Sequence, residues 1–309
     1  MQTRMLAVMN QKGGVGKTTT AVNLAAALAL AGKKVCLIDL DPQAHASLHL
    51  GVTPKHSGET IYEVLVGEIP VCQVISEVSE NLSIVPAHID LAASELELAN
   101  EIGREMILRD ALASLGGQYD YILFDCPPSL GVLTLNALTA ADEVLLPLQP
   151  HFLALHGFSK LLHSIELVAA RLNPTLRLCG IVLCMYDRTT KLALEVESDL
   201  KVFLKEQRQQ NVPWQEAVLF KAKIRRNIRL AEAPSFGTSI FEYDKRSNGA
   251  ADYLAFREEF LSIQQSTQDN VTDHNSGKVL STDTENTHTE AHRDKKASFA
   301  ETLLKKATA

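Results

Sequence analysis

A glycine-rich stretch near the start of the chain has the residue types and spacing that bind phosphate. Residues 10–20 read NQKGGVGKTTT, so three glycines lie between two lysines and a run of threonine follows. Glycines let the backbone turn its N–H groups toward a ligand without Cβ clashes. Lys17 offers a positive charge and Thr18 a hydroxyl that can hold Mg²⁺. The stretch predicts a nucleotide phosphate loop, although Gln11 stands where the ordinary Walker A pattern has Gly and a second lysine, Lys12, lies inside it.

Two acidic segments supply carboxylates of the kind that hold Mg²⁺ and orient water. Asp39 and Asp41 lie in the sequence DLDPQ after an apolar run. Because alternate residues of an extended segment point the same way, both carboxylates can face one ligand. Asp125 ends another apolar run, in DCPPS, which is the usual place for a Mg²⁺-holding aspartate in P-loop proteins. Either segment alone is compatible with an ordinary turn, but together with the loop they predict a site of nucleotide hydrolysis.

A cluster of positive charge lies in the second half of an otherwise acidic chain. Residues 221–229 hold Lys221, Lys223, Arg225, Arg226 and Arg229 and no acidic residue, whereas the whole chain has a net charge of −7. Such a cluster can bind the phosphate backbone of DNA without reading bases. A solvated positive face explains the composition equally well. Aromatic residues are not interleaved with the charges, so recognition of single strands is not expected.

The order of apolar segments predicts the elements that position these residues. Near-continuous apolar runs at residues 5–9, 34–39, 82–86, 120–125, 143–148 and 178–185 indicate buried strands. Helical patterns are found at residues 21–31, 91–115, 157–172 and 191–209. Alternation of this kind is typical of an α/β fold in which helices flank both faces of a mostly parallel, twisted sheet. Ligands of such sheets bind at the carboxyl ends of the strands, where the loop and both acidic segments are expected.

Composition indicates the cellular compartment and the domain organisation. The five cysteines form no C-x-x-C pair, which favours reduced, buried thiols in a cytoplasmic protein. We expect no signal peptide, because the first apolar run leads straight into the loop, and no run approaches the roughly 20 apolar residues of a membrane span. Residues 1–261 are predicted to form one domain. Residues 262–309 are predicted to be a disordered polar tail, in which residues 295–306 have the pattern of a short amphipathic helix.

The motifs resemble those of the ParA/MinD family of deviant Walker A ATPases, which has the P-loop NTPase fold. The resemblance spans about residues 1–260 and includes KGGVGKTT at residues 12–19, DLDPQ and DCPPS. The sequences MYDRT at residues 185–189 and RNIRLAEAPS at residues 226–235 are similar to the ParA/Soj branch in particular. Because the loop begins near residue 10, we expect no helix-turn-helix domain before it.

The resemblance implies roles for single residues, with ATP as substrate and Mg²⁺ as cofactor. Lys12 matches the signature lysine that reaches the partner subunit's nucleotide, Lys17 the lysine that holds the β- and γ-phosphates, and Asp41 the residue that organises the hydrolytic water. The nucleotide-binding residues so implied are Lys12, Gly13, Gly14, Val15, Gly16, Lys17, Thr18 and Thr19. The metal residues so implied are Thr18, Asp39 and Asp125, and the cluster at residues 221–229 corresponds to the DNA-binding region.

The activity implied is that of a partition ATPase. Such proteins form a homodimer with ATP, bind double-stranded DNA non-specifically on the nucleoid, and hydrolyse ATP slowly until a ParB-like centromere-binding protein stimulates them. The cargo is a chromosome or a plasmid.

Two other functions are compatible with parts of the sequence. A MinD-like ATPase that positions itself on a membrane would use the terminal segment with Phe299, Leu303 and Leu304. A reductase resembling nitrogenase iron protein would need cysteines that bridge a cluster between subunits, and Cys126 and its neighbours do not supply that pattern. One departure from the family is His156, which stands where relatives usually have Glu.

Overall fold

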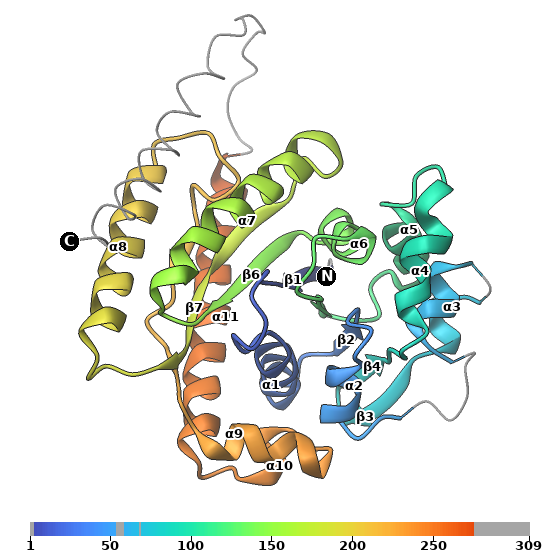
Figure 1. Cartoon of the computed structure of the whole chain (residues 1–309), viewed down its shortest axis with the longest axis horizontal. Helices are drawn as coiled ribbons and strands as arrows, with labels where there is room; N and C mark the ends of the chain where they lie inside the picture. The colour runs from blue at the N-terminus through green and yellow to red at the C-terminus, as the bar shows by residue number, and fades with distance from the viewer. Residues whose placement is uncertain (1–2, 54–58, 68, 275–309) are drawn as a thin grey trace, which may run out of the picture.

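A nine-stranded sheet forms the centre of the computed structural model (Figure 1). The structure describes residues 3–53, 59–67 and 69–274, without the side chains of residues 152–156 and 264–274. The strands run in the order β3-β4-β2-β5-β1-β6-β7-β8, β9 pairs with β7, and all pairs except β3–β4 are parallel. The strands are β1 (Arg4–Val8), β2 (Val35–Asp39), β3 (Ser76–Ser79), β4 (Leu82–Val85), β5 (Tyr121–Asp125), β6 (Glu143–Leu148), β7 (Arg177–Tyr186), β8 (Val218–Leu219) and β9 (Ile224–Arg225).

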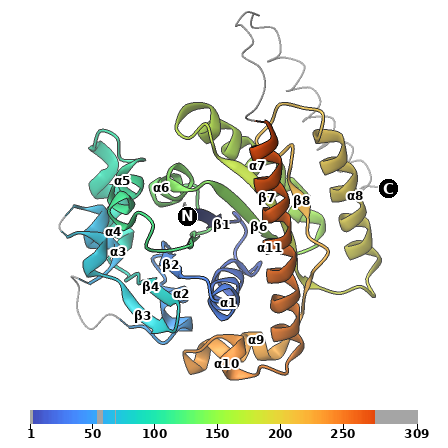
Figure 2. The same ribbon diagram turned by 180° about the vertical axis from the view of Figure 1, so that it is seen from behind.

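Helices cover both faces of this sheet, which confirms the predicted α/β fold. They are α1 (Lys17–Leu30), α2 (His45–His49), α3 (Ile61–Leu65), α4 (Leu91–Glu97), α5 (Ile107–Leu112), α6 (Val132–Ala140), α7 (Phe152–Arg171), α8 (Lys191–Gln207), α9 (Ile228–Glu232), α10 (Ile240–Tyr243) and α11 (Asn248–His274), with short 3₁₀ turns between them. Helices α3 to α8 pack on one face, and α1, α2 and α9 to α11 pack on the other. Figure 2 shows α11 lying across that second face.

Strand β5 shows why the sheet needs cover on both sides. All five of its residues are buried. Ile122 and Phe124 pack into the core beneath α6 and α7, whereas Tyr121 and Leu123 point to the opposite core beneath α1 and α11. A strand with apolar side chains on both faces is stable only between two layers of helices. This explains why the central strands read as continuous apolar runs rather than as an alternating pattern.

The helix predicted over residues 91–115 is wrong, because this segment is broken into several short pieces. Helix α4 ends at Glu97 and α5 begins at Ile107. Gly103 adopts a left-handed backbone, with a φ of 77°, that an α-helix does not allow. The buried side chain of Asn136 on α6 instead holds the intervening loop: it donates to the carbonyl of Arg104 at 2.7 Å and accepts from the Leu108 N–H at 2.9 Å.

The last helix extends further than the composition predicts. Helix α11 continues to His274, past residue 262 where the polar tail was expected to begin. Its apolar residues Tyr253, Phe256 and Phe260 are buried in the core with α1. The change of composition therefore does not mark the end of the helix. The remainder of the predicted tail, residues 275–309, and with it the amphipathic segment at residues 295–306, lies outside the described residues.

Replacing Asn136 by alanine should destabilise the chain. The change leaves the Arg104 carbonyl and the Leu108 N–H without their partner in a buried setting, which costs about 1–3 kcal/mol. Chemical denaturation measures this free energy of unfolding. Asn100, an exposed residue of the same region, is the matched control, and Asn100→Ala should change stability little. Equal stability of the two variants would show that Asn136 does not anchor the loop.

Candidate functional site

The glycine-rich loop connects β1 to α1 at the carboxyl edge of the sheet. Asn10 fixes its start, because its amide donates to the Pro147 carbonyl at the end of β6 at 2.8 Å and its side-chain oxygen accepts from the Lys12 N–H at 3.1 Å. Gly14 and Gly16 have φ values of 71° and 95°, which favour glycine. A Cβ on Gly13 or Gly14 would meet no atom within 4 Å, so the space beside the loop is open to a ligand.

The start of α1 presents a positive site to that open space. Gly16 is the N-cap residue and has no side chain to satisfy the first N–H groups of the helix. Free N–H groups and the helix dipole favour an anion at this point. Lys17, which is only 7% exposed, lies in the same place, with its Nζ donating to the Lys12 carbonyl at 3.4 Å. Burial lowers the pKa of Lys17, and the carboxylates of Asp125 and Asp41 oppose that shift.

Two of the predicted carboxylates meet because their strands are in register. Asp39 ends β2, Asp125 ends β5, and the two residues are paired neighbours in the sheet. Burial, and then the neighbouring Asp39, raise the pKa of Asp125 well above its ordinary value, while the Thr18 hydroxyl lies near enough to oppose the shift. Within the described residues, neither oxygen of the fully buried Asp125 has a well-formed hydrogen bond. A buried carboxylate without a partner is costly, and together with the Thr18 hydroxyl it suits Mg²⁺.

Asp39 has a different environment from Asp125. Its Oδ2 accepts from the N–H and the hydroxyl of Ser47 at 2.9 and 2.7 Å, and its Oδ1 accepts from the Asp41 N–H at 3.2 Å. The Ser47 hydroxyl in turn accepts from the Ala87 N–H at 3.0 Å. Both oxygens of Asp39 are therefore used to shape the turn between β2 and α2. These hydrogen bonds let Asp39 position the turn, and the metal-ligand role that the sequence suggested for it stays a prediction.

The remaining residues of the predicted nucleotide site differ in exposure. Asp41 is buried, and it lies close enough to Lys17 to raise the pKa of that lysine. The Oδ1 of Asp41 accepts from the Gln43 N–H at 2.9 Å. The side chain of Val15 is buried, so only its backbone is open to a ligand, and Thr19 is half-buried. Lys12 is exposed on the outside of the loop. The two lysines of the loop thus face different surroundings.

The structure divides the predicted basic cluster into paired and unpaired residues. Lys223 donates to Glu197 at 2.7 Å and lies 4.9 Å from the ring centre of Tyr186. Arg225 forms a forked ion pair with the buried Asp252, and Arg229 pairs with Glu232 and Asp244.

Lys221 and Arg226 are exposed and form no ion pair within the described part of the chain. The acidic partners of Lys223 and Arg225 are 26 and 27 residues distant in sequence, so composition alone could not find them.

Two polar residues of α1 to which the sequence analysis gave no role, Thr20 and Asn23, connect the helix after the phosphate loop to the C-terminal helices. Asn23 on α1 accepts from the Ile240 N–H at 2.9 Å, which attaches α10 to the helix that follows the loop. Thr20, also on α1, lies 3.2 Å from the hydroxyl of Tyr253 on α11. The preceding residue of α11, Asp252, holds Arg225. Thr20 and Asn23 are polar residues in an Ala/Leu-rich helix, and that contrast was the available signal.

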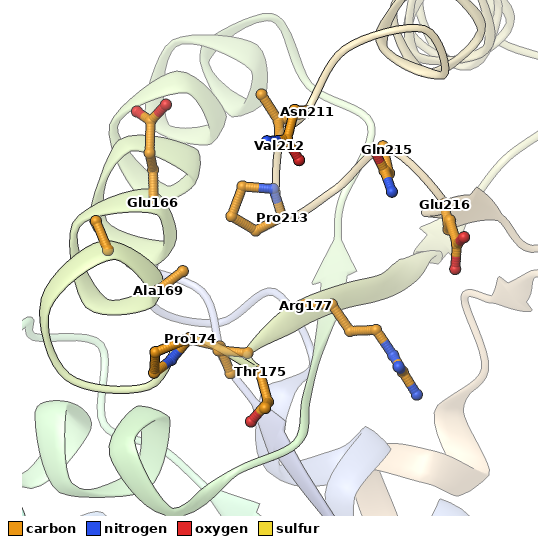
Figure 3. Close-up of a pocket in the computed structure, with 12 residues that line it drawn as sticks. Glu166, Ala169, Pro174, Thr175, Arg177, Asn211, Val212, Pro213, Gln215 and Glu216 are labelled. Atoms are coloured by element: carbon orange, nitrogen blue, oxygen red, sulfur yellow. The ribbon is translucent and has the colours of Figure 1, made fainter. Parts of the chain in front are cut away.

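Two hollows in the surface lie at opposite edges of the sheet. One, of about 450 Å³, is at the amino end of β7, where Glu166 and Ala169 of α7 face Pro213 and Arg177 (Figure 3). It is remote from the phosphate loop and contributes nothing to that site. The other, of about 1110 Å³, lies at the carboxyl edge between residues 149–151, residues 185–190 and the cluster residues Lys223, Arg225 and Arg226. The basic cluster therefore borders the edge that carries the nucleotide site.

Comparisons with known proteins agree with this geometry. The family described as AAA domain matches residues 3–178. The chain is 46% identical to the chromosome partitioning protein ParA of Myxococcus xanthus over 259 residues, which are 84% of this chain and 88% of the relative. It is 44% identical to the sporulation initiation inhibitor protein Soj of Bacillus subtilis over 257 residues, which are 83% of this chain and 97% of the relative.

A solved structure shows the same fold with a nucleotide. The cobyrinic acid a,c-diamide synthase from Mycobacterium smegmatis with bound ADP and magnesium is 38% identical, has a TM-score of 0.72, and matches over 86% of this chain and 96% of that one. The length and identity of the matches to ParA and Soj go well beyond the phosphate loop. From its loop, its paired aspartates and these relatives, the chain belongs to the ParA/Soj family of partition ATPases, which have a P-loop NTPase fold.

Proposed function

We propose that this partition ATPase is a switch that dimerises with ATP, binds DNA non-specifically as a dimer, and leaves DNA after hydrolysis. The observation that carries the proposal is the contrast between the two lysines of one loop. Lys17 is buried beside the carboxylates, whereas Lys12 is exposed. A second loop lysine that its own site does not use is suited to a nucleotide in another subunit.

The site supports a division of labour within one subunit. Lys17, Thr19 and the free N–H groups of loop residues 13–16 would bind the β- and γ-phosphates. Thr18 and Asp125 would hold Mg²⁺, which when bound would neutralise charge on the phosphates. Asp41 is placed to orient the attacking water, and Asp39 keeps the Asp41 turn in position through its hydrogen bonds. Each of these roles is assigned from the exposure of the side chain and from its hydrogen bonds.

Dimerisation would make a weak DNA surface effective. Non-specific binding at one site has a dissociation constant of only about 10⁻⁴ to 10⁻⁶ M at physiological salt. Two surfaces on one dimer gain avidity without new contacts. Among the described residues, Lys221 and Arg226 are the charges of the cluster that form no ion pair. Arg225 and Arg229 are half-exposed beside their acidic partners, and Lys223 is the least accessible. We therefore place the main phosphate contacts at Lys221 and Arg226.

The cellular setting follows from this activity. The protein would associate with the nucleoid in the cytoplasm and respond to a ParB-like centromere-binding protein, with residues 1–261 as the ATPase domain and residues 262–309 as an extension of it. None of the helices in the described part of the chain has the length and apolar character of a membrane span. The segment on which the MinD-like alternative depends, with Phe299, Leu303 and Leu304, lies outside the described residues.

Replacing Lys17 by alanine should abolish ATP binding and hydrolysis. The change removes a buried positive charge from the proposed phosphate site, and a loss of about tenfold or more in ATP affinity corresponds to about 1.4 kcal/mol or more. Fluorescent-nucleotide titration and phosphate release measure the two effects. Lys34→Ala, at an exposed position after α1, is the control and should behave as the unchanged chain. Normal turnover by Lys17→Ala would exclude this loop as the active site.

Replacing Lys12 by alanine should separate ATP binding from dimerisation. Because Lys12 is exposed and lies outside the buried site, the variant should still bind ATP, but it should stay monomeric with ATP where the unchanged chain dimerises. Sedimentation velocity with ATP and with ADP measures the oligomeric state. A dimer of the variant that forms at the same protein concentration would show that Lys12 does not cross the interface.

Replacing Arg226 by alanine should weaken DNA binding equally for all duplex sequences. One phosphate contact fewer lowers the slope of log affinity against log salt by about 1. Lys223→Ala should lower that slope less, because Lys223 is already paired with Glu197. Titrations of random duplex DNA at several salt concentrations test this difference, with ATP affinity as the check on folding. Equal slopes for the unchanged chain and Arg226→Ala would place the DNA surface elsewhere.

A further inference from the structure

The two most exposed large apolar side chains in the described part of the chain, those of Leu96 and Ile102, lie close together in sequence. Leu96 on α4 is 82% exposed and Ile102 in the following loop is fully exposed, and Ile89 just before α4 is 61% exposed. Single exposed apolar residues are ordinary, whereas several that gather on one surface are typical of interaction sites. We call the surface of residues 89–102 that carries Ile89, Leu96 and Ile102 the α4 face.

The α4 face is acidic, which restricts what it can bind. Residues 88–105 contain five acidic residues and one arginine. Asp90 pairs with His88 and Glu105 pairs with Arg104, whereas Glu95 and Glu101 are exposed and form no ion pair within the described residues. Free carboxylates repel DNA and attract basic side chains. Apolar residues among them favour an occupant with both lysine or arginine and apolar side chains, as on an amphipathic segment of a protein.

The α4 face contacts the turn that leads from Asp125 to α6. The carboxylate of Glu95 lies against Gly131, so closely that a Cβ on Gly131 would clash with it. Gly131 caps α6 and ends the turn that begins after Asp125. Asn136 on the same helix holds the backbone of the loop that carries Ile102. An occupant that displaces Glu95 would therefore change the contact with Gly131, in the turn that follows Asp125.

The position of the face leaves the DNA surface free. In both views, helices α4 and α5 lie toward the β4 end of the sheet. Helices α8 and α11, which flank the basic cluster, lie toward the β7 end (Figures 1 and 2). Strand β9, which carries Arg225, pairs with β7, on the far side of the central strands from β4. DNA and a protein occupant of the α4 face would not compete for space.

We propose that the α4 face is the docking surface for a basic, amphipathic segment of the partner that stimulates hydrolysis. The proposal rests on the function proposed above. It adds the place of docking, the chemistry of the docking segment, and a route from that segment to the turn after Asp125 through Glu95 and Gly131.

The test compares two sets of variants of the full chain. Leu96→Ser with Ile102→Ser removes the apolar part of the face, and Glu101→Lys reverses its charge. Val202→Ser and Glu206→Lys make the same changes at exposed positions on α8 and are the matched controls. For each variant, ATP hydrolysis is measured alone and with increasing amounts of the ParB-like protein of the same partition system, and ATP-dependent DNA binding and dimerisation are measured beside it.

We expect the partner concentration for half-maximal stimulation to rise about tenfold or more in the α4-face variants, as for a central contact of an interface. Their basal hydrolysis, DNA binding and dimerisation should match the unchanged chain and the α8 controls. Stimulation equal to that of the unchanged chain would overturn the docking surface and leave the proposed function intact. Loss of dimerisation in the α4-face variants would overturn it in favour of an interface between copies. Failure of the ParB-like protein to stimulate the unchanged chain would overturn the proposed partner and the docking surface together.

Discussion

The carboxylate of Asp125 is buried beside that of Asp39, and much of the active site depends on what compensates this placement. The register of β2 and β5 brings the two carboxylates together, and neither oxygen of Asp125 has a hydrogen bond within the described residues. Burying an unpaired charge costs several kcal/mol. Lys17 and Thr18 from the start of α1 lie beside it. Positive charge beside Asp125 would offset this cost, and a bound Mg²⁺ would supply it.

The helix that begins at this site is also connected by polar contacts to the C-terminal helices. Thr20 and Asn23 on α1 contact Tyr253 of α11 and the backbone of α10. Asp252, next to Tyr253, holds the side chain and the N–H of Arg225 in the basic cluster. Polar contacts in a dry interior are specific because each has few alternative partners. A shift of α1 on nucleotide binding would thus change the surroundings of the basic cluster without any direct contact between the two sites.

Much of the fold and of the nucleotide site could be predicted from the sequence because the relevant signals are local. Continuous apolar runs identified the central strands to within a residue or two, and the phosphate loop is one continuous stretch. The broken segment at residues 91–115 was missed because its backbone follows Asn136, which is distant in sequence. The pairing of Lys223 with Glu197 and of Arg225 with Asp252 was missed for the same reason. Asp39 looked equivalent to Asp125 until the structure placed Ser47 against it.

We propose that the nucleotide state of this protein controls its DNA binding through dimerisation. The most direct measurement is the affinity of the full chain for random duplex DNA with ATP, with ADP and without nucleotide, over a range of protein concentrations that spans the monomer–dimer transition. We expect tight DNA binding only with ATP, and we expect it to rise steeply with protein concentration, in parallel with the fraction of dimer. Equal affinity in all three nucleotide states, or ATP-dependent binding by a protein that stays monomeric, would contradict it.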